Sequence, residues 1–140
     1  MKCPVDKSVM MVVEHRRIEL DYCTKCSGVW LDHGELELLI AVLISEGAKV
    51  PELEPDHSIT KAVRRCPICG VKMEKAWAGN DPRILIDRCP AEHGLWFDAG
   101  ELQKVLHDMC PPGSPQYEDV VSFLGDAFQA THRQAPTGRP

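Results

Sequence analysis

Seven cysteines are the clearest chemical signal in this sequence, because six lie in short-spaced groups or at equivalent positions of a repeat. In the second half, Cys66 and Cys69 are followed after nineteen residues by Cys89, with His93 four positions further on. Two ligands on one tight turn can reach one ion, and a second pair brought alongside completes the tetrahedron that zinc prefers. This spacing predicts a zinc site made by these four residues.

The fourth ligand of this site has several candidates. Glu92 occupies the position that aligns with Cys26 of the first half, and His93 follows it. Imidazole suits zinc better than a carboxylate beside three thiolates, so His93 is the prediction. His107 and Cys110 are alternatives outside this spacing, and Cys110 is interpreted instead as a half-buried free thiol.

The first half offers a related set in which an aspartate stands where a cysteine is expected. Its candidate ligands are Cys3, Asp6, Cys23 and Cys26. Zinc accepts a carboxylate oxygen, so the set predicts a second zinc site that holds its ion less tightly. Other interpretations put His15, His33 or water in the fourth position, or leave a metal-free relic.

Both sets belong to an internal repeat, and repeats are the first pattern to establish in a new sequence. Residues 3–6 align with 66–69 at an offset of 63, and residues 28–36 align with 94–102 at an offset of 66. The three additional residues of the second copy fall in a turn near residues 78–82, where an insertion costs little.

Each copy predicts two strands that bring its ligand pairs together. The apolar and polar residues alternate with a period near two, which is typical of half-buried strands. The predicted strands are residues 11–14 and 18–22 in the first copy, and residues 73–76 and 84–88 in the second.

A helix follows the second ligand pair of each copy, over residues 33–45 and 99–109. Asp32 and Asp98 are the predicted N-caps, and Glu35 and Glu101 lie three residues further on, as in a capping box. Trp30 and Trp96 are expected to cover the small core of each copy. Trp77 has no counterpart in the first copy and is a candidate contact residue.

These elements predict five segments along the chain. They are residues 1–46 (first copy), 47–64 (linker), 65–110 (second copy), 111–130 (C-terminal helix) and 131–140 (disordered tail). The C-terminal helix is predicted to be amphipathic because apolar residues recur at helical spacing. They are Tyr117, Val121, Leu124 and Phe128.

Composition limits the possible functions. The chain of 140 residues has 16 Lys and Arg against 21 Asp and Glu, a formal charge of −5, which argues against binding nucleic acid mainly through phosphates. The longest apolar run, residues 38–44, is too short for a membrane span. With no export signal at the N-terminus, we expect a cytoplasmic protein whose cysteines bind metal instead of forming disulfides.

The pattern Cys-Pro-x-x … Cys-x-x-Cys-x-Gly-Val-Trp-Leu-Asp-x-Gly-Glu-Leu resembles the transcription factor IIB-type zinc-ribbon family of small prokaryotic proteins. Both halves match, over residues 3–36 and 66–102. The resemblance implies a small α+β fold with two tandem zinc ribbons, each a β-hairpin with zinc knuckles followed by a helix. It implies zinc at Cys3, Cys23, Cys26, Cys66, Cys69, Cys89 and His93.

The leading functional hypothesis is a non-catalytic interaction or adaptor protein, whose partner is another protein or a second copy bound through the apolar helices. No residue is placed by the sequence as a general base. One alternative is a transcription-related factor that binds nucleic acid or RNA polymerase, supported by the ribbon resemblance and by basic pairs such as Arg16-Arg17. A metal-handling or redox protein is a further alternative.

Overall fold

The chain folds into two copies of one strand–strand–strand–helix unit. The structure is a computed structural model that describes residues 1–45, 49–79, 83–110, 113–116, 118–119 and 122–123. The first repeat contains β1 (Met11–His15), β2 (Ile18–Tyr22), β3 (Val29–Asp32) and α1 (Glu35–Leu43). The second contains β5 (Glu74–Ala78), β6 (Ile84–Arg88), β7 (Gly94–Phe97) and α2 (Glu101–Met109).

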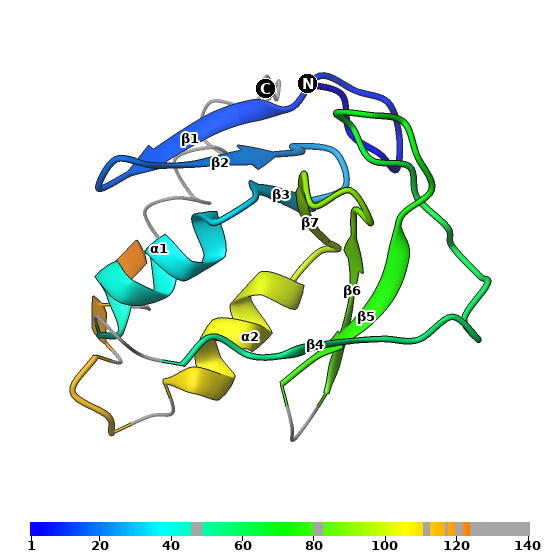
Figure 1. The fold of residues 1–140 in the computed structure, drawn as a ribbon. Coiled ribbons are helices and arrows are strands. Elements are labelled where there is room, and N and C mark those ends of the chain that lie inside the picture. Colours follow the sequence, from blue (N-terminus) through cyan, green and yellow to red (C-terminus); the bar gives the residue numbers. More distant parts are fainter. Residues whose placement is uncertain (46–48, 80–82, 111–112, 117, 120–121, 124–140) are drawn as a thin grey trace.

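The two units share a single antiparallel sheet with the order β1-β2-β3-β7-β6-β5-β4. The repeats meet where β3 pairs with β7, and Trp30 lies directly opposite Trp96. Both helices lie on the same side of this sheet (Figure 1). The two ribbons are therefore joined by backbone hydrogen bonds between their third strands.

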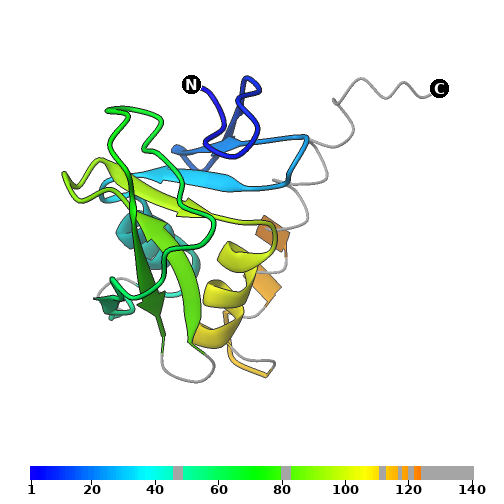
Figure 2. The same cartoon turned by 90° about the vertical axis from the view of Figure 1, so that its right-hand side faces the viewer.

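Strand alternation sends apolar side chains to two separate clusters. Val29 and Leu31 point to the helix side, where they pack in one core with residues of α1 and α2. Trp30, between them, points to the other side and packs among cysteines of both repeats. The N-terminal loop and the loop at residues 65–72, which carry the first cysteine of each repeat, lie at one end of the molecule (Figure 2).

The helices begin later than the sequence predicted, and the predicted N-caps are wrong. Gly34 and Gly100 are the N-cap residues, with φ of 88° and 82°, a left-handed conformation that glycine adopts readily. The carboxylate of Asp32 instead accepts a hydrogen bond from the indole Nε1 of Trp30 at 2.8 Å. The hydrogen bond from the glutamate side of the predicted capping box does form: Glu35 Oε1 accepts from the Asp32 N–H at 2.7 Å.

The segment predicted as a linker contains a strand that the sequence did not predict. β4 (Leu53–Pro55) pairs with β5 and forms an edge of the sheet. Trp77, the candidate contact residue, is engaged within the chain: its Nε1 donates to Asp56 Oδ2 at 3.0 Å, and the Arg83 guanidinium lies 4.6 Å from its ring centroid.

The predicted C-terminal helix lies mostly outside the described residues, including the whole of its predicted apolar stripe. Glu118, Asp119, Ser122 and Phe123 are described and are helical. Phe123 is fully buried in the core between helices and sheet, a role the sequence did not indicate. In the part of the chain that the structure describes, no helix has the length and hydropathy needed to span a membrane.

Candidate metal centres

The first knuckle of each repeat is held by the same backbone hydrogen bonds. The N–H of Cys3 donates to the Ser8 carbonyl at 2.7 Å, and the N–H of Cys66 donates to the Val71 carbonyl at 2.9 Å. Gly70 closes the second of these turns with a φ of 76°. Each turn thereby brings the residue three positions after its cysteine, Asp6 or Cys69, to the same side as that cysteine.

In the first repeat, both knuckles converge on one cluster of four possible ligands. Cys3 Sγ lies 3.6 Å from Cys26 Sγ, and Cys23 Sγ lies 3.4 Å from Asp6 Oδ2. The four ligand atoms all lie within 4.8 Å of one another. The structure thus brings together the set that the sequence predicted, with Asp6 in it.

Asp6 is positioned by Ser8. Its Oδ1 accepts hydrogen bonds from the Ser8 N–H at 3.0 Å and from the Ser8 hydroxyl at 2.5 Å. These bonds lower the pKa of Asp6 to about 2 and leave Oδ2 turned toward Cys23. Outer contacts of this kind orient a ligand before the metal arrives.

In the second repeat, three cysteines and a histidine form the equivalent cluster. Cys69 Sγ lies 3.7 Å from Cys89 Sγ, which lies 3.4 Å from His93 Nδ1. Together with Cys66, their ligand atoms lie within 4.8 Å of one another. These are the four residues that the sequence predicted.

Backbone conformation explains why His93 and not Glu92 joins the cluster. In the first repeat the left-handed residue is Ser27, directly after Cys26, with a φ of 65°. In the second repeat Glu92 itself is left-handed, with a φ of 61°. The turn therefore closes one residue earlier and presents the next side chain to the metal position.

Both clusters fit zinc. A tetrahedron with zinc–sulfur bonds of about 2.3 Å has edges of roughly 3.8 Å, close to the sulfur–sulfur distances in both clusters. Burial raises the pKa of the Cys3 thiol to about 12 and that of Cys66 to about 11. Because the thiolate is the ligand, binding at these positions releases protons. The weaker affinity expected of the first site stays a prediction.

The alternative ligands that have described side chains lie elsewhere. Cys110 is fully buried in the helix-side core and not half-buried as predicted, with its Sγ 3.0 Å from Ser114 Oγ. His107 is exposed on α2 and belongs to neither cluster. The side chain of His15, a further alternative ligand, lies outside the part of the chain that the structure describes.

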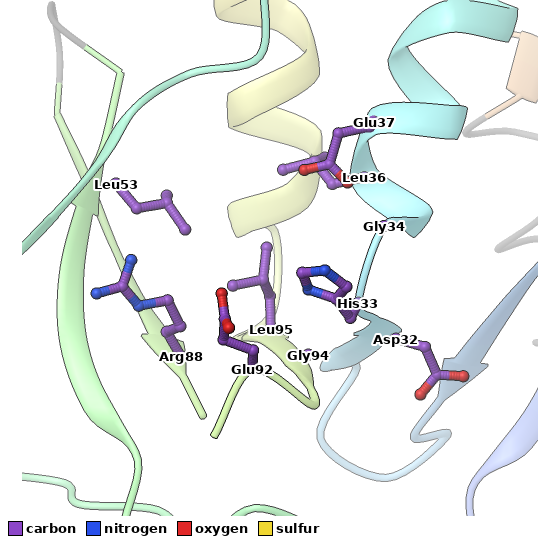
Figure 3. Close-up of a pocket in the computed structure, with 10 residues that line it drawn as sticks. All are labelled: Asp32, His33, Gly34, Leu36, Glu37, Leu53, Arg88, Glu92, Gly94 and Leu95. Atoms are coloured by element: carbon purple, nitrogen blue, oxygen red, sulfur yellow. The ribbon is translucent and has the colours of Figure 1, made fainter. Parts of the chain in front are cut away.

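His33 and Glu92 line a pocket between the repeats instead of binding metal (Figure 3). The pocket has a volume of about 160 Å³ and apolar walls from Leu36, Leu53 and Leu95. None of the eight clustered ligands lines it. The pocket is therefore lined by other residues than the two ligand clusters.

A common apolar cluster joins the two metal centres, which sequence reasoning missed. Trp30, Trp96, Met10 and Met73 pack with buried cysteines of both repeats. A Cβ at Gly28 would collide with the ring of Trp96, and a Cβ at Gly94 would lie 2.6 Å from the ring of Trp30. Each tryptophan thus packs against the second knuckle of the other repeat. The sequence feature that could have indicated this packing is the glycine and the tryptophan at equivalent positions of both copies.

A comparison with protein families finds one model, described as transcription factor zinc-finger, at residues 2–42 and again at residues 65–108. No curated protein and no solved structure matches the chain. The two matched regions cover more than half of the chain, and each contains one complete cluster of ligands. The chain therefore belongs to the transcription factor zinc-finger family, with two tandem copies of its zinc ribbon.

Proposed function

We propose that this protein is a non-catalytic interaction module, in which two structural zinc ions hold a binding surface for another protein. One observation carries the proposal: each cluster supplies four converging protein ligands. Structural zinc sites are closed in this way, whereas catalytic sites keep a position open for water or substrate.

The distribution of exposed apolar side chains supports a docking role. Nine large apolar side chains are exposed among the described residues, and only Leu38 and Val42 of these lie on α1. The other seven lie on or next to the knuckles and on β1. They are Met1, Val5, Val9, Val12, Val63, Ile68 and Val71. Clustered exposed apolar groups are typical of interaction sites. This favours the knuckles and β1 over the helices as the partner surface.

Cobalt substitution tests the closed character of the sites. We expect Co²⁺ to give intense tetrahedral absorption bands that do not change when cyanide or imidazole is added, because no coordination position is free. Zinc content should be two per chain and fall to one in His93→Ala. Bands that shift with added cyanide or imidazole would show an open position and contradict the proposal.

A nucleic-acid ligand is the second candidate, favoured by exposed basic side chains around the knuckles. They are Lys2, Lys7, Lys25, Arg65 and Lys72. Binding of this kind should weaken steeply with salt and should lose affinity when Lys7 and Lys72 are replaced by glutamine. A gel-shift series at low salt, with no retardation of DNA or RNA, would remove this candidate.

A further inference from the structure

A row of directly paired residues crosses the sheet and reads almost the same from both ends. From the β1 edge to β5 the row consists of Val12, Asp21, Trp30, Trp96, Asp87 and Lys75. Directly paired residues lie on the same face of a sheet. The halves differ only at their ends, where the first repeat has Val12 and the second has Lys75.

In the second repeat, cations neutralise the acidic groups of this face. Lys75 Nζ lies 2.8 Å from Asp87 Oδ1, and the two side chains are only 7% and 1% exposed. Arg64 Nη2 lies 3.6 Å from Asp98 Oδ1. Asp87 and Asp98 are thus each paired with a cation.

The first repeat keeps the carboxylates and lacks these cations. Asp21 and Asp32 stand at the positions of Asp87 and Asp98, and Val12 stands at that of Lys75. Within the described ranges, no basic group lies within ion-pair distance of either aspartate, and the N-terminal ammonium acts on Asp21 only from beyond that distance. Glu19, which is exposed, adds a further negative charge on β2.

The outer strand edges of the two repeats also differ: the edge of β5 is covered and the edge of β1 is not. In the second repeat, β4 pairs with β5, and the Asp56 N–H continues the contact by donating to the Lys75 carbonyl at 2.9 Å. In the first repeat, β1 is the outermost strand, and no described residue pairs with its outer edge. Val12 is 60% exposed there. A strand with a free edge and an exposed apolar side chain is a template for pairing.

We propose that the outer edge of β1, together with Glu19, Asp21 and Asp32, binds an extended segment of a partner protein that carries a lysine or arginine. The segment adds to β1 as β4 adds to β5, and its cation takes the place that Lys75 Nζ has in the second repeat. Charge complementarity identifies the partner segment as basic. This inference rests on the proposed interaction function and assigns a surface to it.

The substitution Val12→Lys tests the carboxylate face without any partner. We expect the new ammonium group to pair with Asp21 and raise the Tm of the zinc-loaded chain by several degrees. The matched control Val12→Gln should leave Tm unchanged, and Asp21→Asn should cancel the gain in the double variant. A Val12→Lys variant no more stable than Val12→Gln would overturn the assignment.

A peptide titration tests the docking itself. The probe is a short capped peptide that alternates lysine with threonine, and the control peptide has glutamate in place of lysine. We expect the lysine peptide to shift the backbone amide NMR signals of β1 in the full chain. Binding should weaken at least about tenfold in Val12→Lys, since the cation position is then filled.

Three results would overturn this surface and leave the interaction function standing. They are shifts confined to the knuckles, equal binding of the glutamate peptide, and a dimer that pairs through β1. Cobalt spectra that report an open metal position, by contrast, would count against the interaction function itself.

Discussion

Two glutamates at equivalent positions hold the start of each helix, and they differ in their surroundings. Glu35 Oε1 and Glu101 Oε1 each accept a backbone N–H at 2.7 Å, from Asp32 and Asp98 respectively. Burial, and then the charges of Asp98 and Asp87, raise the pKa of Glu101 to about 7. Burial also raises the pKa of Glu35. The ionised form of Glu101 is therefore a cost to the folded state at neutral pH.

We expect Glu101→Gln to become stabilising relative to the natural chain as pH rises. Between its ordinary pKa near 4.5 and the folded value of about 7, the folded state binds the proton more tightly than the unfolded chain. The contribution of Glu101 to stability is thus present at low pH and lost as pH rises through this window. Glutamine keeps the acceptor for the Asp98 N–H and does not titrate.

Urea denaturation of both zinc-loaded chains below and above this window measures the effect. The gain at high pH should be about 1 kcal/mol, because the side chain is partly exposed and solvent screens its charge. Glu35→Gln is the matched variant in the first repeat. A difference in unfolding free energy that stays constant with pH would contradict the expectation.

At the residue scale, the ligand sets could be predicted because metal coordination depends on residue type and local spacing. Cys66, Cys69 and Cys89 follow from spacing alone. The choice between Glu92 and His93 also depends on which residue takes the left-handed conformation, and two adjacent non-glycine residues give no sequence signal for that.

The hairpin between β1 and β2 has an unusual turn. Its pairing continues to His15 opposite Ile18, so Arg16 and Arg17 form a two-residue loop. Both have positive φ, 50° and 70°, as in a type I′ turn. That turn prefers Asn-Gly, because side chains with a Cβ are strained in the left-handed region.

Replacing Arg16 by asparagine and Arg17 by glycine should therefore stabilise the chain, by about 1 kcal/mol. The gain is expected from relief of backbone strain alone and should persist at high salt. Chemical denaturation of the zinc-loaded double variant checks it, with Arg16→Lys and Arg17→Lys as a control that keeps charge and strain. A gain equal in both variants would disprove the strain account.

At the element scale, periodicity predicted the first two strands of each repeat, but not β3 or β7. β2 and β6 have the predicted bounds, since alternating residues report a half-buried strand directly. The helix starts were misplaced because Asp32 and Asp98 match the residue type of an N-cap. Each carboxylate is instead taken by the indole of the tryptophan two residues earlier, and Gly34 and Gly100 fill the cap position.

The whole molecule is organised around the junction of β3 and β7. Trp30 packs against the second knuckle of the second repeat, and Trp96 packs against that of the first. Each metal centre therefore has part of its wall supplied by the other repeat. Energetic coupling between two sites requires a physical connection of this kind.

We expect zinc at one site to strengthen zinc binding at the other. His93→Ala weakens the second site, and the affinity of the first site should fall with it by about 5–150-fold, the usual range of coupling between sites. Gly28→Ala should act on the junction without changing a ligand, because its Cβ would displace Trp96.

Competition with a chelator, followed by ¹¹³Cd NMR to distinguish the two sites, measures this coupling. The control is His107→Ala, a change to an exposed histidine outside both clusters. First-site affinity that stays unchanged in both His93→Ala and Gly28→Ala would show that the sites are independent.

The joint sheet is the part of the fold that the sequence could not predict. Pairing between β3 and β7 depends on contacts 66 residues apart, since Trp30 meets Trp96, and no local periodicity encodes such a partner. β4 was missed for a related reason: three residues ending in Pro55 carry too little pattern to indicate a strand.

The pseudo-two-fold arrangement about β3 and β7 has an evolutionary consequence. Two ribbons paired through equivalent strands are what gene duplication and fusion of a homodimer would produce. In a homodimer, any substitution occurs on both sides of the axis. After fusion the copies diverge independently, so Lys75 can close one flank with an internal ion pair while Val12 leaves the opposite flank acidic and open.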